Sequence, residues 1–284
     1  MKILFYGSSS YCLPILESLR KSFQIVGVIT KPSGTTRDFA VKFSFPYFTP
    51  ATKTELISIK DKLSALKPDI AVVADFGLII PKDIFGIPKF KTLNIHFSKL
   101  PKLRGASPVQ STILNGQSSA WITVIIMDKG LDTGDIIWQK EVKIKGDETA
   151  EMLYKNLFEI AAQNISDIIN QFVKGNIKPV KQDNTKATYT KILTRGDGFI
   201  SLKDFKLSFS DASLSRQIER KLRAFTPYPG LWTTIKIGNM LKRLKVLKIH
   251  TENNKLILDQ VQLEGKKPVS WKQLKEGYPE IKIT

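Results

Sequence analysis

Short, continuously apolar segments alternate with amphipathic ones through the first half of the chain, and this alternation constrains the fold more than any other feature. Lys2–Tyr6, Gln24–Ile29 and Asp69–Ala74 consist mainly of apolar residues, as do strands that are buried on both faces. Between the first two, apolar residues from Leu13 to Leu19 recur at roughly helical spacing. Such β-α-β alternation predicts an α/β domain with a Rossmann-like parallel sheet covered by helices on both faces.

The same pattern continues to about residue 172. Further strands are expected at Lys91–His96, Thr123–Met127 and Asp135–Lys140, and helices at Lys60–Leu66 and Thr149–Phe172. The turn after the first strand contains only Gly7, so the glycine fingerprint of dinucleotide-binding sheets is absent, as is a Walker A loop. The sheet is therefore expected to bind its ligand without a glycine-rich phosphate loop.

The pattern of apolar and polar residues changes toward the C-terminus. Lys178–Thr190 is polar with little periodicity, which suits a linker. A helix over Ser213–Ala224 is followed by short strands of alternating polarity, typical of a small antiparallel barrel. These strands are Leu231–Ile237, Lys245–His250, Leu256–Leu258 and Gln260–Leu263. We expect an α/β domain over residues 1–184, a linker over 185–204 and a β-barrel domain over 205–284.

The charge of the chain is strongly and unevenly positive. Its 284 residues carry a formal net charge of +18, and 20 basic but only 9 acidic residues lie between Lys186 and Thr284. An excess of this size favours a polyanionic partner, such as nucleic acid or an anionic membrane surface. A lysine-rich composition that merely keeps the surface solvated would give the same excess.

Membrane insertion and secretion are not expected. The longest apolar runs, such as Ile70–Ala74, are far shorter than the ~20 residues that span a bilayer. The first residues resemble a strand, whereas a signal peptide would show a small-residue cleavage site. The one cysteine, Cys12, can form neither an intramolecular disulfide nor a structural zinc site. We therefore expect a cytoplasmic protein.

The two histidines of the chain have different surroundings. His250 lies in a lysine-rich strand and is expected to have an ordinary surface role. Asn94 and His96 are two residues apart, so their side chains share one face of a strand, at the carboxyl end where open α/β sheets bind ligands. An amide beside an imidazole suits acyl transfer, because one stabilises an oxyanion and the other accepts a proton. The alternative is that both residues only cap the following loop.

Two loops contain further candidate residues. Residues 97–108 combine three cations, two prolines and a glycine, which suits an anion or ligand clamp or, alternatively, a solvated connection. Residues 127–135 hold three aspartates between glycines. Calcium loops place their ligands more densely, so no metal is expected. One of these aspartates is expected to orient His96 or a water molecule beside it.

Four motifs together resemble the formyltransferases that use formyl-tetrahydrofolate, and within that family the branch that acts on methionyl-tRNA. They are Asn94-x-His96, Ser98-x-Leu100-Pro101, Arg104-Gly105-Ala106-x-Pro108 and Gly130-Leu131-Asp132-Thr133-Gly134-Asp135. Residues 75–81, 223–230 and 263–268 are similar to further segments of the family, so the resemblance covers nearly the whole chain. Two positions depart from its pattern: Phe97 replaces a glycine and would narrow the space there, and Lys99 replaces a leucine.

The resemblance implies transfer of the formyl group of 10-formyltetrahydrofolate to the α-amino group of methionine on initiator methionyl-tRNA, without a metal. Asn94, His96 and Asp132 would be the catalytic triad. The formyl donor would contact Phe76, Leu78, Ile80, Ser98, Lys99, Leu100 and Pro101. The tRNA would contact Arg104, Lys206, Arg220, Lys221, Arg223, Lys242, Arg243 and Lys245. The protein would be a monomer with a formyltransferase domain over residues 1–184 and an OB-like tRNA-binding domain over 205–284.

Three alternatives remain open. A nucleotide-4-amino-sugar formyltransferase would use the same triad, but a sugar nucleotide has no need of so basic a C-terminal region. A formyl-tetrahydrofolate deformylase would carry a regulatory domain ahead of the catalytic one, whereas here the catalytic fold begins at Met1. An RNA-binding protein built on an inactive enzyme fold would fit the substitutions at Phe97 and Lys99.

Overall fold

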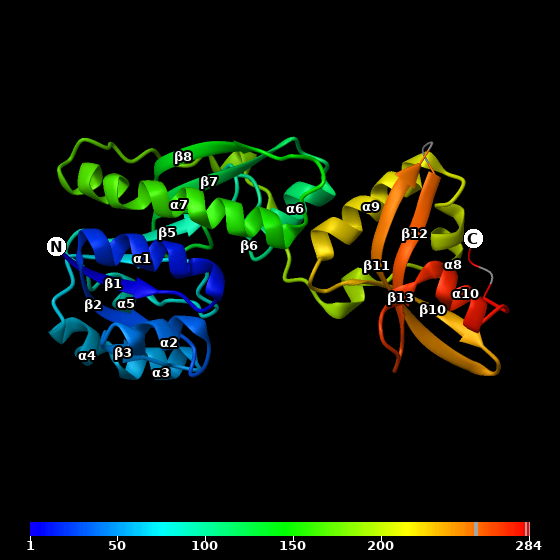
Figure 1. The fold of residues 1–284 in the computed structure, drawn as a ribbon. Coiled ribbons are helices and arrows are strands. Elements are labelled where there is room, and N and C mark those ends of the chain that lie inside the picture. Colours follow the sequence, from blue (N-terminus) through cyan, green and yellow to red (C-terminus); the bar gives the residue numbers. More distant parts are fainter. Residues whose placement is uncertain (253–254, 282, 284) are drawn as a thin grey trace. The chain divides into compact units, whose positions relative to one another are not determined.

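The chain forms two compact units (Figure 1). The computed structural model describes residues 1–252, 255–281 and 283. The first unit consists of Met1–Pro108, Ser119–Lys143 and Tyr154–Thr190, and the second of Val109–Ser118, Ile144–Leu153 and Lys191–Thr284. Two short segments that interrupt the first unit along the sequence therefore belong to the second.

The first unit is built on a seven-stranded sheet of order β3-β2-β1-β4-β5-β7-β8. Its strands are β1 (Lys2–Tyr6), β2 (Gln24–Ile29), β3 (Tyr47–Phe48), β4 (Ile70–Val73), β5 (Thr92–His96), β7 (Ser119–Ile126) and β8 (Ile136–Lys143). The first five run parallel, as predicted. However, β7 is antiparallel to β5 and β8 to β7, so the sheet is mixed. Residues 127–135 join β7 to β8 without a helix, and only a crossover connection makes parallel neighbours.

Both faces of this sheet are covered, which explains why its strands are continuously apolar. Leu4 and Tyr6 point to one face of β1, where they share a core cluster with Leu56 and Ile84. Ile3 and its neighbours on the opposite face are buried as well. Over the sheet α1 (Leu13–Ser22) and α7 (Ala150–Val173) lie side by side (Figure 1), and the hydroxyl oxygens of Ser18 and Ser166 are 3.5 Å apart. The remaining helices of this unit are α2 (Thr35–Lys42), α3 (Lys53–Ser58), α4 (Lys60–Ala65) and α5 (Lys82–Phe85).

A second, two-stranded sheet ties together distant parts of the first unit. In it β6 (Arg104–Gly105) pairs in parallel with β9 (Tyr189–Thr190). β9 lies within the polar segment Lys178–Thr190, for which the linker interpretation was wrong. Polar composition indicates exposure to water, but it does not reveal that the backbone pairs with a loop some 85 positions earlier.

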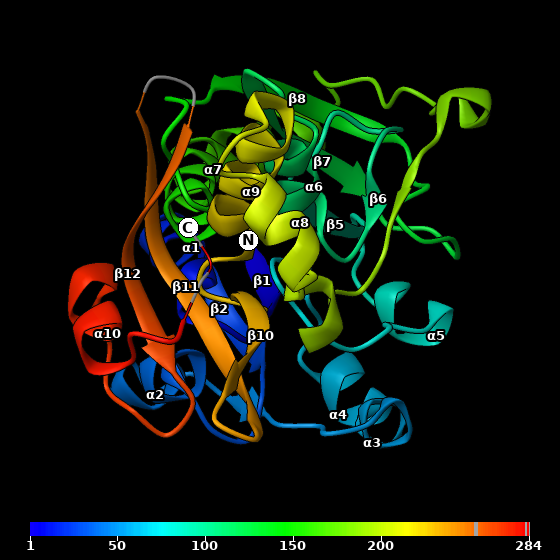
Figure 2. The same cartoon turned by 90° about the vertical axis from the view of Figure 1, so that its right-hand side faces the viewer.

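The second unit contains an antiparallel sheet of order β10-β11-β12-β13, and the antiparallel prediction is confirmed. Its strands are β10 (Leu231–Ile237), β11 (Met240–Glu252), β12 (Lys255–Leu263) and β13 (Val269–Ser270). Figure 2 shows β11 and β12 side by side. The two strands predicted around Asp259 are one strand, because β12 continues through this residue with an irregularity in its pairing to β11. Within the described residues, β10 and β13 lie at the two edges of the sheet.

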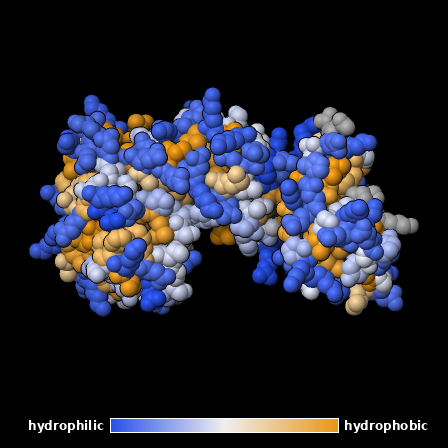
Figure 3. All heavy atoms as spheres, viewed as in Figure 1, coloured by the Kyte–Doolittle hydropathy of each residue, from blue (hydrophilic) through white to orange (hydrophobic). Residues whose placement is uncertain are grey.

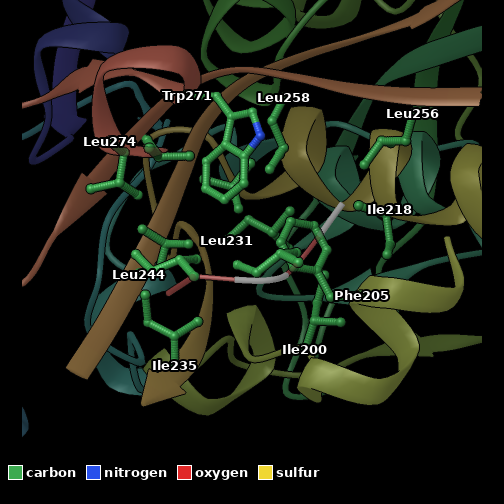
Figure 4. Packing of buried hydrophobic residues seen from close by; sticks show 14 of the residues in the cluster. Ile200, Phe205, Ile218, Leu231, Ile235, Leu244, Leu256, Leu258, Trp271 and Leu274 are labelled. Atoms are coloured by element: carbon green, nitrogen blue, oxygen red, sulfur yellow. The ribbon is translucent and has the colours of Figure 1, made fainter. Parts of the chain in front are cut away.

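Helices close the apolar face of this second sheet. They are α8 (Leu202–Leu207), α9 (Ala212–Phe225) and α10 (Trp271–Gly277). Helix α6 (Pro108–Leu114) begins at the last residue of the first unit's opening range, and its other residues belong to the second unit. Phe205, Ile218 and Trp271, one from each of the first three, meet Leu244 and Leu258 in a single buried cluster (Figure 4). This core holds β11 in place, and with it the basic residues of that strand.

The surface of both units is largely hydrophilic on the face shown in Figure 3, with apolar side chains in smaller areas between.

The longest helix, α7, is interrupted by charged residues, which are Glu151, Lys155, Glu159 and Asp167. Among the described residues, no helix combines the length and the apolar character needed to cross a membrane.

Candidate active site

The predicted triad meets at the carboxyl end of β5. Asn94 and His96 share one face of this strand, and His96 is only 7% exposed. Asp132 reaches them from the loop between β7 and β8. Its Oδ1 accepts a hydrogen bond from Asn94 Nδ2 over 3.3 Å, and its Oδ2 lies 3.6 Å from His96 Nδ1. An amide, an imidazole and a carboxylate are thus in contact at one edge of the sheet.

Neighbouring backbone groups orient this triad. His96 Nε2 lies 2.9 Å from the carbonyl oxygen of Leu103. Because a carbonyl only accepts hydrogen bonds, Nε2 carries the proton in this contact and Nδ1 faces the Asp132 carboxylate. The amide of Gly105 donates to Asp132 Oδ2 over 2.8 Å. The loop after β5 therefore fixes both the imidazole and the carboxylate.

Asn94 retains hydrogen-bonding capacity toward a bound molecule. One hydrogen of its Nδ2 is directed to Asp132. A side-chain amide has two such hydrogens, and no described residue accepts the second. The site can therefore present a hydrogen-bond donor and an oriented imidazole to the same reacting group. Acyl transfer needs both, one to stabilise an oxyanion and the other to accept a proton.

The acidic loop 127–135 is closed by its own side chains. Asp128 Oδ1 accepts from the Gly130 amide over 3.0 Å and from the Thr133 hydroxyl over 2.6 Å. Within the described part of the chain, no group of three or more His, Cys, Asp or Glu side chains is arranged to hold a metal ion. Asp132 is the aspartate of this loop that contacts His96.

The loop after His96 separates into buried and exposed residues. Ser98 and Leu100 are each 2% exposed. The Ser98 hydroxyl donates to the Lys102 carbonyl over 2.6 Å, and the Leu100 carbonyl accepts from Gln139 over 3.0 Å. These two predicted ligand contacts therefore shape the loop from inside. Lys99 is exposed, with its ammonium 4.1 Å from the centre of the Trp121 ring, and Pro101 is half-buried.

In the segment after β4, one of the three predicted contacts to the formyl donor is buried. Val73 lies opposite Asn94 in the sheet, so residues 74–81 leave the sheet beside the triad. Phe76 and Leu78 are half-buried, but Ile80 is 6% exposed and belongs to the core. Its neighbour Ile79, which was not among the predicted contacts, is 77% exposed. The apolar surface offered here is therefore that of Phe76, Leu78 and Ile79.

Phe97 does not narrow the site as expected. It is 5% exposed, and its ring lies edge-on to Phe158 and Tyr154 of α7, with centroids 4.6 and 5.9 Å away. Because consecutive strand residues point to opposite faces, a bulky residue after His96 is directed away from the imidazole. Its volume fills the core beneath α7.

Arg104 is wrongly predicted as a tRNA contact. It is 1% exposed, and its Nη2 donates to Gln182 Oε1 over 2.7 Å and to Asn184 Oδ1 over 2.8 Å. A guanidinium enclosed in this way cannot reach a phosphate. Gln182 was not recognised from the sequence, because it lies in a polar segment without periodicity and its partners are far away in the chain.

The basic residues predicted to contact tRNA in the second unit have unequal environments. Arg223 pairs with Glu219 and donates to the Glu148 carbonyl over 3.2 Å, so its charge is partly neutralised. The Arg220 guanidinium lies against Gly116. Lys206 on α8 is exposed, while Lys221 on α9 and Lys242 on β11 are half-buried.

Arg243 and Lys245 form the clearest cationic surface of this unit. They are two residues apart on β11 and so share one face of the sheet. Lys245 lies opposite Trp232 of β10, and the Arg243 guanidinium lies 4.7 Å from the centre of the Trp232 ring. Cations beside an aromatic ring suit a nucleic-acid surface.

Comparisons with known proteins show which family the chain is similar to. The sequence profile described as "Formyl transferase" matches residues 1–169, and that described as "Formyl transferase, C-terminal domain" matches residues 200–256. A methionyl-tRNA formyltransferase from Roseiflexus castenholzii is 32% identical over 302 residues, which cover 95% of this chain and 93% of that protein.

Two solved structures show the same fold. The methionyl-tRNA formyltransferase from Clostridium thermocellum superposes with a TM-score of 0.63 at 23% identity, covering 93% of this chain and 98% of that one. An N-formyltransferase from Helicobacter canadensis, in complex with folinic acid and dTDP-3-aminofucose, gives a TM-score of 0.66 at 22% identity and covers 89% of each chain.

Proposed function

The chain belongs to the formyl transferase family, and we propose that it transfers the formyl group of 10-formyltetrahydrofolate to the α-amino group of methionine on initiator methionyl-tRNA. The observation that carries this proposal is the contact among Asn94, His96 and Asp132. It is supported by the relative from Roseiflexus castenholzii, which is named a methionyl-tRNA formyltransferase.

The reaction proceeds by attack of the amine nitrogen on the formyl carbon, which gives a tetrahedral intermediate with a negatively charged oxygen. Asn94 donates the second hydrogen of its amide to this oxygen, an interaction worth roughly 10²–10³ in rate. His96 takes the proton of the amine at Nδ1, directly or through water, because its Nε2 already donates to the Leu103 carbonyl, and the imidazolium that forms stabilises the same charge. Asp132 keeps the imidazole in place. The bond between the formyl carbon and the folate nitrogen then breaks, and this nitrogen leaves with a proton. Because the amine attacks the formyl carbon directly, no covalent bond to the protein is formed.

The formyl donor is proposed to lie between two segments that leave the sheet beside the triad. Phe76, Leu78 and Ile79 offer apolar surface, which fits a flat heterocycle. Lys99 and Lys102 are exposed on the loop after His96, and such cations fit the carboxylates at the other end of a folate. Ser98, Leu100 and Ile80 support these surfaces from within.

The tRNA is proposed to bind to the second unit. Arg243 and Lys245, beside Trp232, are the strongest candidates for contacts to phosphates and bases, and Lys206 is a further exposed cation. Lys221 and Lys242 are half-buried, as is Arg243, whereas Lys245 is exposed. We further propose that the protein acts as a monomer in the cytoplasm, where charged tRNA and the formyl donor are both dissolved.

The test of this function is an assay on purified protein with 10-formyltetrahydrofolate and two acceptors in parallel. We expect formylmethionyl-tRNA in the tube with methionyl initiator tRNA and no product with a 4-amino-sugar nucleotide. Product with the sugar nucleotide alone would instead indicate that the chain formylates 4-amino-sugar nucleotides. Binding of tRNA without any product would contradict the enzymatic function.

A further inference from the structure

Two residues that orient the triad have a backbone conformation that side chains disfavour. Asp132 has a φ of 54° and Leu103, whose carbonyl contacts His96, has a φ of 57°. Both angles lie in the left-handed region, which is unfavourable for residues with a Cβ atom. Contacts outside these residues must therefore hold them there.

Those contacts come from one segment, residues 182–190, which we call the strap segment. Gln182 Nε2 donates to the carbonyl oxygens of Asp132 over 2.8 Å and of Gly134 over 2.7 Å. Thr188 Oγ1 accepts from the amide of Leu103 over 2.8 Å. The strap segment thus bonds directly to both residues of unfavourable backbone conformation.

The orientation of the Gln182 amide follows from the chemistry of its partners. Two of them are backbone carbonyls, which only accept, and the third is the Arg104 guanidinium, which only donates. Nε2 must therefore face the carbonyls and Oε1 must face Arg104, as observed. Both hydrogens and the oxygen of this amide are used, so the side chain has one orientation.

The buried Arg104 side chain holds the strap segment in place through hydrogen bonds. It is 1% exposed, and its partners are the neutral Gln182, Asn184 and Tyr189. None of the described carboxylates pairs with it. A buried cation needs its hydrogen bonds satisfied, so Arg104 keeps Gln182 in place, while the Arg104 amide donates to the Thr188 carbonyl over 2.9 Å.

We propose that Gln182 is a positioning residue for the triad, and that the strap segment sets the distance between His96 and Asp132. Gln182 fixes the backbone of Asp132, and Thr188 fixes Leu103, which in turn holds His96 Nε2. Neither residue contacts a reacting atom. The kinetic part of this proposal rests on the proposed function, and its structural part does not.

The first test is Gln182→Glu, which preserves shape. The new carboxylate still accepts from Arg104, now as an ion pair, so the melting temperature should stay close to that of the parent. It offers acceptors to the two carbonyls that need donors, so the Asp132 loop should be released. We expect kcat for formyl transfer to fall by roughly 10–100-fold, with KM for methionyl-tRNA within about twofold.

The split between kcat and KM separates positioning from a merely structural role. Displacement of the Asp132 loop should lower kcat in protein that is fully folded, whereas KM for methionyl-tRNA should stay within about twofold of that of the parent. Thr188→Val, which removes the acceptor for the Leu103 amide, should reduce kcat independently of Gln182→Glu.

A matched control lies on the same unit. Gln171→Glu changes an amide that bonds Asp167 and Asn176. It should leave kcat unchanged. The proposal is overturned if Gln182→Glu retains kcat within about twofold of the parent, or if its kcat falls only in proportion to a loss of folded protein.

Hydrogen exchange tests the structural part without any activity. Peptides covering residues 127–135 should exchange roughly tenfold faster in Gln182→Glu than in the parent or in Gln171→Glu. Unchanged exchange would overturn the proposal. If the parent protein formylates neither acceptor, the proposed function fails, and this measurement still decides whether Gln182 holds the Asp132 loop.

Discussion

At the scale of single residues, the site depends on which nitrogen of His96 faces which partner. Nε2 is engaged by the Leu103 carbonyl and Nδ1 faces Asp132. Asn94 is tied to the same carboxylate through one hydrogen of its amide. Asp132 therefore orients both of the groups that are proposed to act on the formyl group.

Replacement of His96 tests its assigned role directly. His96→Ala should lower kcat by roughly 10²–10⁴-fold, the usual contribution of a general base, while the affinity for tRNA and the melting temperature stay near those of the parent. The matched control is His250→Ala, which removes the other histidine of the chain. That residue is exposed and paired with Asp259 in the second unit. A variant lacking His96 that kept near-parental kcat would contradict the triad.

The single cysteine offers a second test at this scale. Burial raises the pKa of the Cys12 thiol to about 11, and its Sγ donates to the Ser9 carbonyl over 3.1 Å. Because the thiolate is the reactive form, native protein at pH 8 should not react with a disulfide reagent, whereas denatured protein should release one equivalent. Rapid labelling of the native protein would show that Cys12 is accessible.

At the scale of elements, short polar segments do more to build this site than regular helices. The strap segment pairs with the loop after β5, and that loop contacts both His96 and Asp132. Short polar contacts also stabilise the start of the second unit's longest range, which begins at Lys191. Asp197 accepts from the amide and hydroxyl of Thr194 in a capping box and pairs with Lys191.

This capping box predicts a pH-dependent stability. The Lys191 ammonium, together with the Thr194 amide and hydroxyl, lowers the pKa of Asp197 to about 2. The pKa is about 4 in the unfolded chain, so the stabilisation is present above pH 4 and is lost as the pH falls toward 2. Asp197→Asn should reduce the free energy of unfolding by up to about 1 kcal/mol at pH 7. Urea titrations at decreasing pH should show this difference shrinking, and a constant difference would exclude the carboxylate as its cause.

At the scale of the whole molecule, charge and catalysis belong to different units. The triad lies in the first unit, whereas the exposed cations of β11 lie in the second. A protein that neutralises phosphates releases counterions from the nucleic acid, so its affinity falls with salt. The affinity for tRNA should therefore respond to the second unit's charges while kcat does not.

Charge reversal on β11 tests this division. The double variant Arg243→Glu/Lys245→Glu should weaken tRNA binding by about tenfold or more and flatten the dependence of log Kd on log salt by roughly one to two units. The matched control is Lys60→Glu/Lys62→Glu, which alters two lysines at helix α4 by the same charge. Fluorescence titrations at several salt concentrations measure both. Equal losses in the two variants would indicate a non-specific field rather than a tRNA surface on β11.

The sequence by itself determined six of the seven strands of the first sheet, all but the short β3, and the shared face of Asn94 and His96. These are local properties, because side chains alternate along a strand and buried strands need apolar residues on both faces. The family motifs added the choice of Asp132 among the three aspartates of its loop.

Only the tertiary structure decided which groups surround the triad. The burial of Arg104, the bonds from Gln182 to the Asp132 loop and the reversal of β7 all involve partners distant in the chain. Residues near the site but outside any periodic element, such as Gln182 and Thr188, carry no local signal. Their roles arise from the packing of loops against one another, because a hydrogen bond depends on where two atoms meet and not on the residues beside them in the sequence.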